Sequence, residues 1–193
     1  MNVRRIHLVR HVPPVSPGLL WGHGDVAPAV VDCAVLHQRV QEAAPKQLVS
    51  SDLARAVLPA QRLAKKLGLE LETSPDWREL DFGAWDGLAP EAIDVEALTA
   101  FWEDPEANPP SGGERWSQLC ARVRAGLAAL EDGALVVTHA GAMRAALSVL
   151  TGLDHHGVWA IDLPYRARLT LRIWPGSTLA GQVVGLDIGD ALP

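Results

Sequence analysis

The sequence predicts an α/β fold built on a mostly parallel sheet with an antiparallel edge. Short runs of branched apolar residues alternate along the chain with longer segments whose apolar side chains recur at helical spacing. The last two apolar runs follow each other directly, separated by a turn-rich stretch, which is typical of an antiparallel pair. The length of 193 residues suits one domain with a sizeable core.

The amino-terminal quarter predicts a strand, a long loop, a helix and a second strand. Residues 5–9, RIHLV, form the expected first strand, and the Pro- and Gly-rich stretch 12–31 forms the loop. A loop of that length in a compact domain is usually functional. Residues 32–44 have near-helical apolar spacing and end before Pro45. QLVSS (47–51) then predicts the second strand.

Residues 51–68, SDLARAVLPAQRLAKKLG, give the strongest helix prediction. Ser51 or Asp52 can cap the amino-terminal end, and Gly68 fits the carboxyl-terminal end. Pro59 lies inside the segment and disfavours a straight helix.

The rest of the chain predicts further alternation of strands and helices. The segment from about 80 to 131 is long for a simple crossover, and we interpret it as a helical insertion that covers a site like a lid. The expected elements are a strand at 69–74, an irregular segment at 75–95, helices at 96–103 and 114–131, a strand-turn-helix unit at 133–150, and two edge strands in ARLTLRIW and GQVVGLDI.

Composition excludes several classes of protein. A net charge of -6 and a pI near 5.6 argue against a dedicated nucleic-acid binder. Two cysteines, Cys33 and Cys120, do not make a disulfide framework. The first residues lack the pattern of a signal peptide, and no apolar run is long enough to span a bilayer. We therefore expect a cytoplasmic protein without nucleic-acid or membrane partners.

Residues suited to chemistry follow each of the four predicted strands of the parallel sheet. Ligands of open parallel sheets bind beyond the carboxyl ends of the strands, so these residues are expected at one shared site. Arg78, which precedes Glu79, is interpreted as a surface residue. The candidates are Arg10 and His11 after the first strand, Arg55 after the second, Glu79 after the third, and His139 after the fourth.

The chemistry of this set favours a phosphoryl group as ligand. Arginine offers forked donors that fit phosphate oxygens, and a helix amino terminus offers free N–H groups. A neutral imidazole is a competent nucleophile, and a nearby carboxyl group can protonate a leaving alkoxide and then activate water. The sequence shows no metal-ligand spacing and no P-loop motif.

Five motifs carry a resemblance to a known family. LVRHV, SSDLARAVLPA, RELDFGAWDGL, PPSGGE and VVTHAG occur in the order and spacing of the histidine phosphatase superfamily, whose members resemble cofactor-dependent phosphoglycerate mutase. The resemblance covers about residues 4–150. It implies a three-layer α/β/α sandwich and a phosphohistidine mechanism that needs neither a bound cofactor nor a metal.

The resemblance also implies roles for the candidate residues. His11 resembles the nucleophile that takes the phosphoryl group, and Glu79 resembles the general acid that later acts as base. Arg10, Arg55 and His139 resemble the phosphate pocket. One departure is Val12, where the family usually has glycine. Glycine permits positive φ and close backbone approach, whereas valine permits neither easily, so we interpret Val12 as a change in specificity.

The pattern RHxxPxxPGLLWGxxD is similar to the α-ribazole phosphatase branch of cobalamin synthesis. By motif position, Trp21 and Gly22 are expected to bind substrate beside the phosphate pocket, where tryptophan could stack on an aromatic base. The expected partner is a small-molecule phosphate ester, and the expected state is a monomer or homodimer. Two alternatives stay open, a phosphoglycerate mutase-type phosphoryl transfer and a non-catalytic phospholigand-binding protein.

Overall fold

The computed structural model describes residues 2–31 and 33–188, and its centre is a sheet in the strand order β3-β2-β4-β1-β5-β6. Strands β1 to β4 run parallel, and β5 and β6 add the antiparallel edge. The predicted sheet is thereby confirmed. The strands are β1 (Arg4–Arg10), β2 (Gln47–Ser50), β3 (Leu71–Thr73), β4 (Ala134–Thr138), β5 (Arg168–Ile173) and β6 (Gly181–Asp187).

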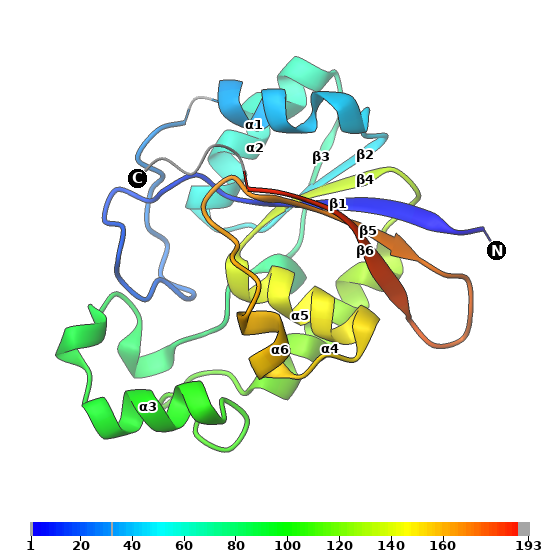
Figure 1. The fold of residues 1–193 in the computed structure, drawn as a ribbon. Coiled ribbons are helices and arrows are strands. Elements are labelled where there is room, and N and C mark those ends of the chain that lie inside the picture. Colours follow the sequence, from blue (N-terminus) through cyan, green and yellow to red (C-terminus); the bar gives the residue numbers. More distant parts are fainter. Residues whose placement is uncertain (1, 32, 189–193) are drawn as a thin grey trace.

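Helices cover both faces of the sheet and make the three layers (Figure 1). On one face lie α1 (Ala34–Val40) and α2 (Ala54–Leu67), and on the other lie α4 (Trp116–Ala129), α5 (Ala140–Thr151) and α6 (His155–Trp159). Helix α3 (Val95–Glu103) lies apart, toward the side of the molecule that also carries the loop after β1 (Figure 1).

Side chains along the central strands alternate between two hydrophobic cores, one on each face of the sheet. In β1, Ile6 and Leu8 enter the larger core against α4 and α5, whereas Val9 enters the smaller core under α1 and α2. In β4, Val136 and Val137 divide between the two cores in the same way. All five residues of β4 are buried, as expected for a strand with helices on both faces.

Helix α2 begins three residues later than predicted, because the predicted caps bind elsewhere. The residue at its N-cap is Leu53, which has no side-chain acceptor. Asp52 pairs instead with Arg78, and the cap comes from the long loop, where Asp25 Oδ1 accepts from the backbone N–H of Ala54 at 2.7 Å.

The other end of α2 follows the sequence. Gly68 ends the helix in the left-handed region at a φ of 68°, which glycine adopts without strain. The helix also continues through Pro59, which lies on its buried side.

The predicted insertion contains two helices with different surroundings. Helix α4 packs against α5 in the layer below the sheet. Helix α3 contacts α6, where the rings of Trp102 and Trp159 lie 5.6 Å apart and His155 Nε2 donates to the carbonyl of Glu103 at 2.8 Å. Helix α6 was not predicted, since we interpreted the His155–His156 pair as surface residues of a helix-terminal loop. The two histidines begin the helix instead.

Two further expectations concern the described residues only. Within residues 2–31 and 33–188, no helix is long and apolar enough to cross a bilayer. Cys33 is buried and Cys120 is half-buried, and both are free thiols.

Candidate active site

The carboxyl ends of the parallel strands meet at a cavity of about 140 Å³. Five of the predicted site residues line it, namely Arg10, His11, Trp21, Arg55 and Glu79. His139 and Gly22 are not part of the lining. The remaining lining is apolar or aromatic and comes from Pro14, Leu19, Leu20, Phe82 and Tyr165.

His11 is oriented by its own backbone. Its Nδ1 lies 2.5 Å from the carbonyl oxygen of Val12, and because a carbonyl can only accept, Nδ1 carries the proton. The lone pair is therefore on Nε2. Burial, followed by the charges of Arg55 and Arg10, holds the pKa of His11 well below the usual 6.5. The imidazole is thus neutral near pH 7, as a nucleophile must be.

Arg10 lies between the cavity and a turn that follows α6. Its Nη1 donates to the carbonyl of Leu163 at 2.7 Å, and its guanidinium lies 4.0 Å from the ring centroid of Tyr165. The Nε of Arg10 is buried and has no hydrogen-bond partner among the described residues.

Arg55 binds the long loop as well as lining the cavity. Its two terminal nitrogens donate to the carbonyls of Trp21, Gly22 and Gly24 at 2.6 to 3.0 Å. The side chain is 1 % exposed, and within the described chain its Nε also lacks a partner. Arg55 therefore holds the loop segment 21–24 in place. Its proposed contact with phosphate would use the Nε–H group, which the loop carbonyls leave free.

His139 packs against the ring of the nucleophile. It is fully buried, and its ring centroid lies 4.8 Å from that of His11. Its Nε2 lies 2.9 Å from Ser51 Oγ, whereas Nδ1 is buried without a partner in the part of the chain that the structure describes. Burial and the neighbouring Arg55 lower the pKa of His139 well below its usual value.

The carboxylate of Glu79 is fixed at the amino terminus of α5. Oε1 accepts from the N–H of Leu80 at 2.8 Å, and Oε2 accepts from the N–H of Gly141 at 3.1 Å. A Cβ added at Gly141 would lie 1.9 Å from Oε1, so only glycine leaves room for this carboxylate. The glycine of the THAG motif is therefore part of the site, a role that the sequence analysis missed.

A half-buried arginine braces the segment that carries Glu79. Arg122 of α4 donates to the carbonyls of Asp76, Arg78 and Glu79 at 2.7 to 3.0 Å. It also forms an ion pair with Glu114 at 2.8 Å. Sequence reasoning missed Arg122, although its partner is the glutamate of the PPSGGE motif.

Close packing also fixes the loop that carries Trp21. Asp86 accepts from the N–H groups of Gly22 and Gly24 at 3.1 and 2.5 Å. A Cβ on Gly22 would approach the backbone of Leu80 and Phe82 to 2.7 Å, so glycine is required there by packing. The structure thus packs Gly22 against the backbone of residues 80–82, and its proposed contact with substrate stays a prediction.

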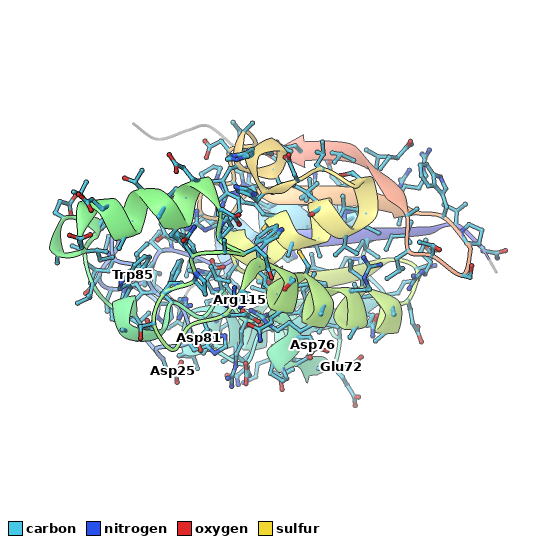
Figure 2. All side chains as sticks on the ribbon, turned by 90° about the horizontal axis from the view of Figure 1, so that it is seen from below. Asp25, Glu72, Asp76, Asp81, Trp85 and Arg115 are labelled. Carbon is cyan, nitrogen blue, oxygen red and sulfur yellow. The ribbon has the colours of Figure 1, made fainter. Side chains whose placement is uncertain are left out.

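Several acidic and aromatic side chains gather at the same end of the molecule. Figure 2 shows Asp25, Asp81 and Trp85 toward the side on which α3 lies. Asp81 Oδ2 lies 3.4 Å from His23 Nδ1, and Trp85 packs on Phe101 with ring centroids 5.6 Å apart. These contacts hold loops together around the cavity rather than line it.

Val12 does not carry the backbone strain that a glycine position would suggest. Its φ is not among the positive values, and its side chain is 2 % exposed in the smaller core with Val9 and Leu36. The valine thus points away from the cavity, and its effect on specificity stays a prediction.

The buried histidines make the stability of the protein depend on pH. Burial, with Arg168 and Arg5, lowers the pKa of His7 to about 4, and the pKa values of His11 and His139 also lie below 6.5. Below pH 6.5 the unfolded chain binds protons that the folded chain excludes. We expect the free energy of unfolding to fall as the pH drops below 6.5, by at most about 1.4 kcal/mol per pH unit for each histidine.

Urea denaturation at a series of pH values measures this slope. The slope should decrease by one histidine's share in His7→Gln. An equal slope in His7→Gln and the wild type would contradict the prediction.

An open sheet with a cationic, histidine-bearing cavity at its carboxyl edge is typical of proteins that bind phosphate groups. The comparisons with known proteins give the family. The model of the histidine phosphatase superfamily (branch 1) matches residues 30–181, and the chain belongs to that superfamily.

Three known proteins show what this chain is similar to in sequence or in fold. The Yersinia enterocolitica protein named "Probable phosphoglycerate mutase GpmB" is 31% identical over 170 residues, which cover 79% of this chain and 77% of that protein. The glucosyl-3-phosphoglycerate phosphatase of Mycobacterium tuberculosis is 37% identical over 82 residues, 42% of this chain and only 37% of that protein's length. The solved α-ribazole phosphatase of Shigella flexneri shares the fold, with a TM-score of 0.76, 22% identity, and 93% and 95% of the two chains covered.

Proposed function

We propose that the protein is a phosphomonoesterase that works through a phosphohistidine intermediate on His11. The observation that carries the proposal is the set of buried donors around the nucleophile. Within the described residues, Arg10 Nε, Arg55 Nε and His139 Nδ1 are buried without partners. Unsatisfied buried donors cost free energy, and the oxygens of a phosphoryl group would satisfy them.

The proposed reaction has two steps. In the first, His11 Nε2 bonds to phosphorus, the ester P–O bond breaks, and the carboxyl group of Glu79 protonates the departing alkoxide. In the second, Glu79 takes a proton from water, whose oxygen bonds to phosphorus as the P–N bond breaks. Arg10, Arg55 and His139 stabilise charge on the phosphoryl oxygens in both steps.

The wall of the cavity favours a leaving group with apolar or aromatic character. Leu19, Leu20, Trp21 and Phe82 supply contact area without charge. We propose α-ribazole 5′-phosphate, which carries an aromatic base, as the substrate. We further propose that the part of the 80–131 insertion that carries α3 acts as a lid, because α3 lies apart from the layers of the fold (Figure 1), whereas α4 packs against α5.

A second candidate function is phosphoglycerate mutase-type transfer. The specific observation in its favour is the similarity to the Yersinia protein over most of both chains. Transfer requires that the phosphohistidine survive while the substrate turns, so 3-phosphoglycerate would become 2-phosphoglycerate without release of phosphate.

Phosphate release from a small panel of substrates tests both candidates. The panel holds α-ribazole 5′-phosphate, glucosyl-3-phosphoglycerate, 3-phosphoglycerate and p-nitrophenyl phosphate, each with and without EDTA. We expect turnover that survives EDTA, with α-ribazole 5′-phosphate preferred by at least tenfold in kcat/KM. Preference for glucosyl-3-phosphoglycerate would replace the proposed substrate, and isomerisation without phosphate release would favour the mutase. Binding without turnover would indicate a phospholigand-binding protein.

A further inference from the structure

The turn over residues 164–167 is bonded directly to the strand end that carries the nucleophile. The N–H of Arg10 donates to the carbonyl of Ala167 at 2.9 Å, and the N–H of Arg166 donates to the carbonyl of Arg10 at 3.1 Å. The turn is closed by a bond from Ala167 N–H to the carbonyl of Pro164 at 3.0 Å. The backbone of this turn is therefore held against β1 at the mouth of the site.

Arg166 occupies an uncommon backbone conformation within that turn. Its φ is 68°, in the left-handed region that disfavours a side chain by about 1–2 kcal/mol. Such a conformation persists only where the surrounding bonds impose it, and it points to a function for the segment. Its consequence here is the placement of the preceding residue, Tyr165, as part of the cavity wall.

The ring of Tyr165 is fixed by contacts on two sides. The Arg10 guanidinium lies 4.0 Å from its centroid, and the His11 ring lies 5.4 Å away at an angle of 57°. The contact with Arg10 uses the face of the ring, so it does not require the phenolic hydroxyl group. Tyr165 is also the only tyrosine in the sequence.

A second aromatic ring of the cavity is equally fixed. The indole N–H of Trp21 donates to the carbonyl of Ser16 at 2.8 Å, and the ring lies close to Gly87, where an added Cβ would approach it to 3.1 Å. Tyr165 and Trp21 come from opposite halves of the chain and line the same small space. The alcohol part of any ester whose phosphoryl group reaches His11 must lie beside these two rings.

We infer that Tyr165 is a specificity-determining residue, which with Trp21 selects phosphate esters whose leaving group carries a flat aromatic ring. The inference rests on the proposed function, because it concerns the alcohol that leaves when His11 is phosphorylated. Because the rings of Tyr165 and Trp21 are already held in place, binding a planar group costs them little side-chain entropy.

A matched pair of esters tests the inference. Benzyl phosphate and cyclohexylmethyl phosphate have leaving alcohols of similar size, and they differ in whether the ring is flat. We expect the wild type to prefer benzyl phosphate about 5- to 10-fold in kcat/KM, the size of an aromatic pair contact. Tyr165→Leu should bring the ratio near one, whereas Tyr165→Phe should keep it. Trp174→Leu, which removes an exposed aromatic residue, should also keep it.

Inhibition by inorganic phosphate controls for damage to the phosphate pocket. Tyr165→Leu removes the ring beside Arg10, so the inhibition constant is expected to rise. The two esters share the same phosphoryl group, so this damage lowers kcat/KM for both alike and leaves their ratio unchanged. Equal turnover of the two esters by the wild type, or an unchanged ratio in Tyr165→Leu, would overturn the inference while leaving the phosphatase function in place. Failure of the wild type to hydrolyse either ester or any other member of the substrate panel would overturn the proposed function and the inference together.

Discussion

His11→Ala is expected to lower kcat for every phosphate ester at least about 10⁴-fold, because it removes the atom to which the phosphoryl group is transferred. His11 Nε2 is the nitrogen that the Val12 carbonyl leaves unprotonated, and the low pKa of the ring keeps it neutral. Among the described residues, His11 is the only histidine that lines the cavity.

Rapid quenching with a ³²P-labelled substrate measures the intermediate directly. The wild type should trap label that is stable in alkali and lost in acid, as expected of a phosphoramidate. His11→Ala should trap none, and His156→Ala, a substitution at an exposed position, should trap as much as the wild type. Label that persists in His11→Ala would exclude His11 as nucleophile.

Gly141→Ala is expected to lower kcat about 10²–10³-fold, as the loss of a positioned general acid does. The new Cβ would lie 1.9 Å from Glu79 Oε1, so the carboxylate must leave its position at the amino terminus of α5. Alanine otherwise favours a helix over glycine by about 1 kcal/mol, which offsets part of the steric cost. The kinetic effect should therefore greatly exceed the effect on stability.

Steady-state kinetics and urea denaturation together check this prediction. Glu79→Gln should lose activity to a similar extent. The matched control is Gly126→Ala, a second helical glycine, whose new Cβ would lie 3.0 Å from the ring of Trp77. That variant should change stability and leave kcat within about twofold. Activity in Gly141→Ala near that of the wild type would show that Glu79 can act from another position.

The sequence was informative where chemistry follows from topology. Arg10, His11 and Glu79 each follow a predicted strand, and the carboxyl ends of parallel strands meet at one edge, so their convergence was predictable. The position of Tyr165 was not predictable, because it depends on a left-handed turn at Arg166 that no residue type in the turn indicates.

The same limit applies to contacts between distant segments. Arg122 lies on an ordinary amphipathic helix, and only the packing of α4 shows that its guanidinium reaches the carbonyl of Glu79. Asp25 likewise caps a helix 29 residues further along the chain, whereas local reasoning searched for the cap among the neighbours of that helix. The sequence therefore predicted the residues at the strand ends but not the side chains from distant segments, such as Arg122 and Asp25, that hold the neighbouring segments in position.

The bond between His11 Nδ1 and the carbonyl of Val12 has a consequence for how this site tolerates sequence change. The acceptor that selects the tautomer of the nucleophile is a main-chain atom, so no substitution at residue 12 can delete it. The side chain at that position is meanwhile committed to the core beneath α1 and α2. Evolution can therefore vary residue 12 to suit the packing of the interior while the chemistry one residue away keeps its proton in place.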